Sequence, residues 1–173
     1  MSTDPNYYLT KITSEHNLAP KFVAMMGLFA QFTVDHQTQT LSMPSIYDLD
    51  NAVGVQLDAV GQWIFGSPIA RFVQVPFPGG PLTRLDDAHF RILLKARIIS
   101  NQWDGTVPGA YRAWAVLFAG TGLQVLIADH DNMTAQYGLT GPADAVTQAL
   151  FQAGLLELKP DGVHITYVIG TPS

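Results

Sequence analysis

The sequence predicts an α+β fold, in which a helical, bundle-like N-terminal half is followed by a small antiparallel sheet built from a hairpin, a helix and further strands. Two observations lead to this prediction. Residues 86–120 repeat apolar side chains at intervals of three and four, which is typical of two amphipathic helices joined by a polar turn. After Gly122 the pattern becomes β-branched and alternating, as in strands. With 173 residues, 47% of them hydrophobic, the chain can bury a substantial core.

Three regions are expected along the chain, or one continuous domain that contains them all. Residues 1–17 form an N-terminal arm, and residues 18–120 form a helical region with a long loop at 67–84. Residues 121–173 form an α+β region. The arm is too short to build a core of its own. It either docks on the body or on a neighbouring subunit, or is a frayed terminus.

The first long helix is expected to begin at Pro20 and to end near His36, with a polar loop at 38–44 after it. Proline is favoured in the first turn of a helix because the N–H that it lacks has no intrahelical partner there. One side of this helix carries Phe22, Met25, Met26, Phe29, Phe32 and Thr33. The stripe is either core or, because methionine side chains adapt their shape, a binding face.

A second helix is expected across residues 46–66, directly after Ser45. Gly54 and Gly61 lie seven residues apart beside its apolar stripe. Glycine inside a helix costs about 1 kcal/mol relative to alanine, so a pair at this spacing needs a reason. We expect another backbone to approach closely there, and we assign that backbone to residues 86–120.

The helices of residues 86–120 are expected to be central. Asp86 or Asp87 can cap the first of them, which is apolar on two sides and therefore packs between layers. Thr106 can cap the second, and Pro108 fits within its first turn. The core face of the second helix is Ala110, Trp114, Leu117 and Phe118.

The connection at 67–84 contains four prolines and two glycines, which exclude a regular element throughout. Two interpretations remain open for its apolar residues: a strand at 71–75 on a sheet edge, or a loop inserted into a partner. The C-terminal region is then expected to hold a hairpin (123–127 and 133–139), a helix (143–153) and a strand pair (155–158 and 163–169).

No residue pattern predicts an active site. The densest ionisable cluster is Asp129-His130-Asp131, and a histidine between carboxylates can serve as a general base or a metal ligand. Aspartate is also common in hairpin turns for backbone reasons, and successive turn side chains diverge. The acidic set at Asp48, Asp50 and Asp58 lacks EF-hand spacing and is explained by helix capping and a solvated face. With no cysteine and no catalytic motif, we predict no enzyme, no metal site and no cofactor.

The charge content favours a protein that is covered by partners. Charged residues make up 13% of the chain, about half of the ~25% in a typical soluble domain. The alternative is a neutral surface rich in Gln, Asn, Thr and Ser. A net charge of −5 without a basic cluster disfavours nucleic-acid binding. The start of the chain lacks the pattern of a secretory signal, and no apolar run is long enough to predict a membrane span.

Three stretches together resemble a known family. They are YDLDNAVGVQLD at 47–58 with Gly61 and Gly66, DDAHFRILLKAR at 86–97 followed by Asn101 and Gly105-Thr106, and KPDGV at 159–163. Their order resembles small tail proteins of contractile-tailed bacteriophages, encoded among baseplate genes, over roughly residues 44–169. The resemblance implies a structural, non-enzymatic subunit of the baseplate wedge. It carries over no functional residue.

The resemblance also implies partners and a place. The partners are other baseplate wedge proteins, the J-like subunits, and tail-tube or sheath-proximal proteins, in a hetero-oligomeric assembly without nucleic acid or membrane. The place is the virion, with assembly in the host cytoplasm. The candidate interface residues are Tyr7, Tyr8, Leu9, Phe72, Val75 and Phe77, because aromatic anchors bury large areas at low entropic cost. Two other functions stay open: a tail-assembly factor absent from the mature virion, and a tail-associated hydrolase.

Overall fold

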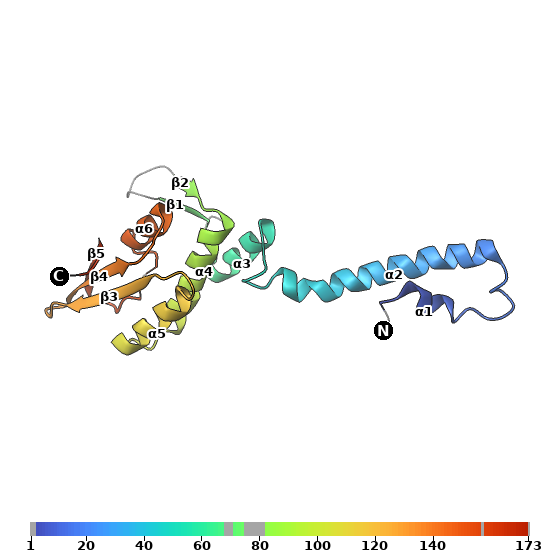
Figure 1. Cartoon of the computed structure of the whole chain (residues 1–173), viewed down its shortest axis with the longest axis horizontal. Helices are drawn as coiled ribbons and strands as arrows, with labels where there is room; N and C mark the ends of the chain where they lie inside the picture. Colours follow the sequence, from blue (N-terminus) through green and yellow to red (C-terminus); the bar gives the residue numbers. More distant parts are fainter. Residues whose placement is uncertain (1–2, 68–70, 75–81, 157, 173) are drawn as a thin grey trace. The chain divides into compact units, whose positions relative to one another are not determined.

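The computed structural model describes residues 3–67, 71–74, 82–156 and 158–172 (Figure 1). The chain divides into two compact units, which we call the N-terminal unit (Met1–Ala52) and the C-terminal unit (Val53–Ser173). The first is helical, and the second combines helices with a short hairpin and a three-stranded sheet. This composition confirms the predicted α+β class.

The N-terminal unit consists of two helices. They are α1 (Pro5–Leu9) and α2 (Pro20–Ile46). Asp4 caps α1 by accepting a hydrogen bond of 2.9 Å from the backbone N–H of Asn6. The arm lies along α2, where Ala30 and Val34 are buried, so it docks on the long helix of its own chain.

The long helix extends well past its predicted end at His36, and the expected loop at 38–44 is wrong. The polar residues of that stretch continue the helix, and their hydroxyl groups donate to carbonyls of the preceding turn. Thr40 donates to the carbonyl of His36 over 2.9 Å. Pro44 lies in the last turn, and the helix ends two residues after it. Polar side chains on an exposed helix do not stop it unless they compete for its backbone groups.

Three helices form the first part of the C-terminal unit. They are α3 (Val55–Phe65), α4 (Asp87–Gln102) and α5 (Val107–Leu117). The predicted single helix across 46–66 is wrong, because the helical structure is interrupted between the end of α2 at Ile46 and the start of α3 at Val55. Gly54 is the N-cap of α3 with a φ of 55°, a left-handed value that glycine adopts at little cost.

Gly61, the second glycine of the pair, lies inside α3 and packs closely against α4. A Cβ added to Gly61 would overlap the ring of Phe90 on α4, and Leu94, also on α4, lies nearby. Residues 86–120 therefore approach Gly61 closely, as predicted, but through the side chain of Phe90 and not through a backbone, and no described atom lies within 4 Å of a Cβ added to Gly54. At Gly61, the packing against Phe90 leaves no room for a side chain.

The predicted caps and core face of α4 and α5 are confirmed. Asp86 accepts from the N–H of His89 over 2.8 Å, and Thr106 accepts from the N–H of Gly109 over 3.0 Å. All four residues predicted for the core face of α5 are buried. The indole N–H of Trp114 donates to the carbonyl of Leu156 over 3.3 Å, which ties α5 to the segment after the last helix.

The segment between α3 and α4 contains a short antiparallel hairpin of β1 (Phe72–Gln74) and β2 (Leu82–Arg84). Of the two interpretations left open, the strand is observed, although its partner comes from the same segment and not from a larger sheet. The hairpin is anchored by Arg71, a buried residue whose Nη1 lies 2.7 Å from Oδ1 of Asp87 on α4.

The rest of the C-terminal unit is a three-stranded sheet with one helix. The elements are β3 (Gln124–Asp129), β4 (Thr134–Thr140), α6 (Ala145–Gln152) and β5 (His164–Ile169). The sheet order is β3-β4-β5, with β3 antiparallel and β5 parallel to β4. The predicted hairpin is confirmed, whereas the sheet is mixed and not antiparallel as expected. The connection through α6 returns the chain to the end of the sheet where β4 began, as in other parallel crossovers.

The expected strand at 155–158 is absent from the described residues of that stretch. Leu156 and Leu158 are buried, and their carbonyls accept hydrogen bonds from side chains. Leu156 accepts from Trp114, and Leu158 accepts from the hydroxyl of Tyr137 over 2.9 Å. The segment therefore closes the core through side-chain hydrogen bonds instead of joining the sheet.

Candidate interaction surfaces

The long helix α2 exposes a row of large apolar side chains. We call this row the outer face of α2: Met25, Leu28, Phe29 and Phe32. Leu28 is 75% exposed and Phe32 is 73% exposed. No charged residue occurs between Phe22 and Val34, so no charge interrupts the row. A contiguous apolar stripe on a soluble protein commonly marks an interaction site.

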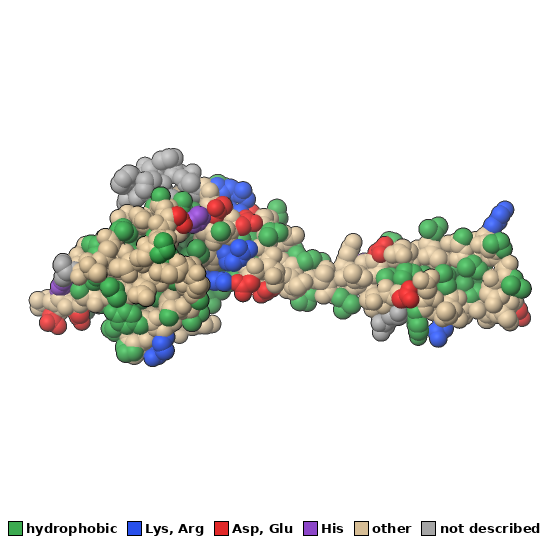
Figure 2. Space-filling model, viewed as in Figure 1, with side chains coloured by type: hydrophobic (Ala, Val, Ile, Leu, Met, Phe, Trp, Pro, Cys, Tyr) green, Lys and Arg blue, Asp and Glu red, His purple; other side chains and the backbone are tan. Residues whose placement is uncertain are grey.

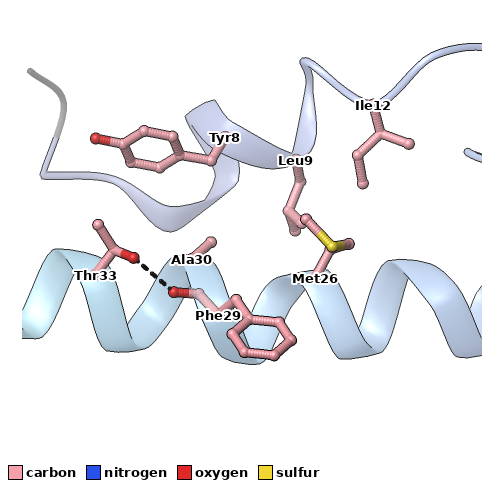
Figure 3. Close-up of a pocket in the computed structure, with 7 residues that line it drawn as sticks. All are labelled: Tyr8, Leu9, Ile12, Met26, Phe29, Ala30 and Thr33. Carbon is pink, nitrogen blue, oxygen red and sulfur yellow. Dashed lines mark hydrogen bonds between the residues drawn. The ribbon is translucent and has the colours of Figure 1, made fainter.

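The outer face lies next to the side of α2 that α1 covers, and Phe29 lies at the boundary, where it also lines the cavity against the arm. A cavity of about 190 Å³ lies between the arm and α2, and Figure 3 shows the residues that line it. Leu9 and Met26 point toward each other across this space, while the ring of Phe29 points away from α1 (Figure 3). The helix thus has one apolar side occupied by the arm and a second one exposed. Figure 2 shows hydrophobic side chains spread over α1 and α2 with few charged groups among them.

This arrangement bears on the stripe predicted for α2. Met25, Phe29 and Phe32 are exposed, whereas Phe22 and Met26 are half-buried. The stripe therefore does not form a core within the N-terminal unit. Of the two interpretations, the geometry favours a binding face.

The candidate interface residues fall into two groups. Tyr7, Tyr8 and Leu9 lie together on α1, where the ring of Tyr7 meets that of Tyr8 edge-on at 5.5 Å. Tyr7 is 48% exposed, whereas Leu9 is half-buried against α2. Phe72 belongs to the other unit, on β1, and is 42% exposed. Val75 and Phe77 lie outside the described residues.

A further exposed patch lies on α3 and was not predicted. Trp63 is 90% exposed, and Val55 at the start of the same helix is also exposed. These residues are eight apart, with Ala59 between them, so they follow one side of the helix. The spacing of four was visible in the sequence. Periodicity alone does not show which side of a helix is exposed.

The turn that holds Asp129 and Asp131 has a structural role. Oδ1 of Asp129 accepts from the N–H of Asp131 over 2.9 Å, as in an Asx turn. Asp131, Asn132 and Met133 all have positive φ, between 50° and 61°. The carboxylates thus shape the turn, in agreement with the interpretation from sequence. Among the described residues, no group of three His, Cys, Asp or Glu is placed to hold a metal ion.

A charged cluster of His89, Asp86 and Asp144 was not predicted from the sequence. His89 on α4 has Nδ1 2.6 Å from Oδ1 of Asp86 and Nε2 3.1 Å from Oδ1 of Asp144. Partial burial lowers the pKa of His89, but the hydrogen bonds to both carboxylates and their negative charges outweigh it, so the pKa lies above the usual 6.5. The cluster joins residues 55 apart in the sequence, and no local pattern could have shown it.

The same cluster perturbs both carboxyl groups. The backbone N–H of His89 is the main cause that lowers the pKa of Asp86 below the usual 3.8. Burial acts to raise the pKa of Asp144, but the N–H of Thr147 and the imidazole of His89 together lower it. Asp86 and Asp144 also cap α4 and α6, so the cluster ties two helix N-termini together. These contacts hold the starts of the two helices against each other.

Comparison with known proteins identifies the family of the chain. A family model described as bacteriophage baseplate wedge 1 protein matches residues 8–78 and 70–167. No curated protein gives a match. In the part of the chain that the structure describes, no helix has the length and hydropathy needed to cross a membrane. Since the matched segments extend over most of both units, the chain belongs to the bacteriophage baseplate wedge 1 family.

Proposed function

We propose that this chain is a structural subunit of the baseplate wedge that binds other wedge proteins through the outer face of α2. Membership of the family supports a structural role in the baseplate of a phage tail. The observation that carries the binding role is the uninterrupted apolar row from Met25 to Phe32. A helix with apolar side chains on two sides is stable in water only when both sides are covered.

The spacing of the outer face fits a helix as its partner. Met25, Leu28 and Phe32 are separated by three and four residues, which is the interval of knobs that insert between the side chains of a facing helix. An uncharged row also requires a partner with few charges, because a buried charge without a counter-ion is costly. The partner surface is therefore an amphipathic helix of another wedge protein.

The area of the outer face is adequate for such a contact. Its four side chains are between 48% and 75% exposed. At ~150–200 Å² for a fully exposed side chain of this size, they offer roughly 400–500 Å². A standard interface buries about 800 Å² on each partner. The outer face therefore supplies more than half of one interface, and the remainder comes from neighbouring residues of the unit.

Further contacts complete the proposed assembly. The arm residues Tyr7, Tyr8 and Leu9 and the loop residues Phe72, Val75 and Phe77 serve as additional anchors. The partners are the J-like wedge subunits, with tail-tube or sheath-proximal proteins next to them. The assembly is hetero-oligomeric, is built in the host cytoplasm and stays in the virion. It involves no nucleic acid, membrane, cofactor or catalysis.

Mass spectrometry of purified phage particles tests the structural role. A structural subunit is present at a fixed ratio to the other wedge proteins in every preparation. A tail-assembly factor is found in infected cells and is missing from finished particles. A tail-associated hydrolase degrades peptidoglycan in a gel assay, which a structural subunit does not. Absence from particles, or clearing in the gel, contradicts the proposal.

A further inference from the structure

The outer edge of β5 carries unpaired backbone groups. The N–H of His164 donates to the carbonyl of Met133 and that of Gly170 to Leu139, both over 2.8 Å. Because successive residues of a strand direct their backbone groups to opposite sides, Ile165, Tyr167 and Ile169 point theirs away from β4. The sheet order ends at β5, and no described residue bonds to that side.

The opposite edge of the same sheet is protected. On β3, the outward N–H of Ile127 donates to the hydroxyl of Tyr111 over 3.0 Å, so α5 satisfies part of that edge. The strand also ends in Asp129, with Asp131 close behind it. Charges and covering side chains are the usual devices that prevent an edge from pairing with another chain.

In the part of the chain that the structure describes, none of these devices is found on β5. The chain has no Asp, Glu, Lys or Arg from Val163 to its last residue. The strand itself, HITYVI, consists mainly of β-branched and aromatic residues, which favour strand pairing. Ile169 is 43% exposed at the edge. The contrast with β3 indicates that the outer edge of β5 is kept available.

The edge is also held in place for pairing. The ring of Tyr167 packs edge-on against Phe151 of α6, with centroids 5.4 Å apart, and Ile165 is buried. These contacts lie on one face of β5, so they fix the strand without covering its outer backbone groups. Figure 1 shows α6 beside this end of the sheet and β4 between β3 and β5. A preorganised edge loses little entropy when a further strand is added.

We infer that the outer edge of β5 pairs with an extended strand from another baseplate protein, which extends the sheet to four strands. The inference rests on the proposed function, since it assumes that the chain is bound within a wedge. The backbone of the added strand bonds to Ile165, Tyr167 and Ile169. Its side chains are uncharged and rich in β-branched or aromatic residues, because a charge placed beside β5 meets no counter-charge there.

Amide hydrogen exchange tests the inference residue by residue. The full chain is measured alone and in complex with the wedge proteins encoded beside it, with NMR detection of individual amides. In the free chain, the amides of Ile165, Tyr167 and Ile169 exchange fast, while those of Thr166 and Val168 are protected by β4. In the complex, the three outward amides slow by at least about tenfold, and the two inward amides change little.

The other possible outcomes contradict the added strand, the proposed function, or both. Slow exchange of the three outward amides in the free monomer shows that the edge is already covered. Unchanged fast exchange in a complex that does form refutes the added strand and leaves the proposed function intact. Failure of any complex to form refutes the proposed function and the inference together. Protection that appears only with a doubling of the chain's own mass shows pairing with a second copy and refutes the heterologous strand.

A pair of variants at Ile169 separates backbone from side-chain effects. Ile169→Pro removes one outward N–H that has no partner among the described residues, so the fold is retained and binding to the wedge partner weakens by about fivefold or more. Ile169→Ala keeps the N–H and removes most of the side chain. Equal binding by both variants shows that the backbone group makes no contact and overturns the inference. Chemical-shift agreement with the wild type checks that each variant is folded.

Discussion

Nε2 of His89 lies 3.1 Å from Oδ1 of Asp144, which joins the first turn of α4 to the first turn of α6. The other ring nitrogen lies 2.6 Å from Oδ1 of Asp86. A neutral imidazole can donate from only one of its two nitrogens, so only the protonated ring can donate to both carboxylates. The link between the two helices therefore depends on the charge of one histidine.

The first prediction is a pH-dependent stability that originates at His89. Because the pKa of His89 is raised in the folded protein, its contribution is fully present below the unfolded value of 6.5 and is lost as the pH rises through the folded value. His89→Gln is expected to lower the free energy of unfolding by about 1 kcal/mol at pH 5.5 and by much less at pH 9. Thermal unfolding across this range measures the difference.

The carboxylates set the acid limit of the same effect. The pKa values of Asp86 and Asp144 are lowered in the fold, so their contribution is present above about 3.8 and is lost as the pH falls through the folded values. His130→Gln, which changes an exposed histidine in the β3–β4 turn, is the matched control. A loss in His89→Gln that is the same at every pH contradicts the role assigned to the imidazolium.

The second prediction concerns two helical glycines with opposite surroundings. A Cβ on Gly61 overlaps the ring of Phe90, so Gly61→Ala is expected to destabilise the C-terminal unit by about 1–3 kcal/mol through overpacking. Gly27 on α2 has room, with Leu9 4.0 Å from the added atom. Gly27→Ala should therefore stabilise its helix by up to about 1 kcal/mol. Denaturant titration of both variants checks this, and a stabilised Gly61→Ala refutes the close packing of α3 on α4.

The third prediction concerns the buried Arg71. Its guanidinium pairs with Asp87, lies 2.5 Å from Oδ1 of Asp58 without the angle of a hydrogen bond, and stacks 4.7 Å from the centre of the Phe90 ring. Arg71→Met removes the buried cation from both carboxylates, so that Asp87 loses its pair and Asp58 keeps only its surface pair with Arg84. Because both carboxylates are about one-third exposed, water offsets part of the loss, and we expect a cost of about 2 kcal/mol.

Arg84→Met is the matched control for this site. Arg84 is mostly exposed and lies 3.5 Å from Oδ2 of Asp58, a surface pair worth at most about 0.5 kcal/mol. Arg71→Lys is expected to rescue little, because one ammonium group cannot reach both carboxylates as a guanidinium does. Urea unfolding of the three variants compares these losses. Equal costs for Arg71→Met and Arg84→Met contradict the anchoring role of Arg71.

The sequence predicted those parts of the fold that depend on neighbouring residues. The caps at Asp86 and Thr106 were correct, because a cap needs only the residue itself and the N–H groups of the next turn. The two glycines at positions 54 and 61 show the limit. Both are glycines, yet Gly54 adopts a positive φ at the start of a helix, whereas Gly61 makes room for Phe90.

The remaining differences arise from contacts between distant residues. The direction of β5 depends on the crossing of α6, and the pairing of His89 with Asp144 spans 55 residues. The predicted end of α2 is too early because the polar residues at 38–44 have the composition of a loop. No residue before Pro44 interrupts the helix. The stripe on α2 was recognised, but whether it is buried depends on how much of the chain packs against the helix, and periodicity alone does not show this.

The most direct test of the central claim is the mass, by light scattering, of the chain coexpressed with its wedge partners, for the wild type and for Leu28→Gln/Phe32→Gln. The polar control Gln31→Ala/Thr38→Ala changes exposed residues off the outer face of α2. Wild type and control are expected to elute at the mass of a complex, and the outer-face variant at the mass of the folded chain alone. An outer-face variant that assembles as well as the wild type contradicts binding through α2.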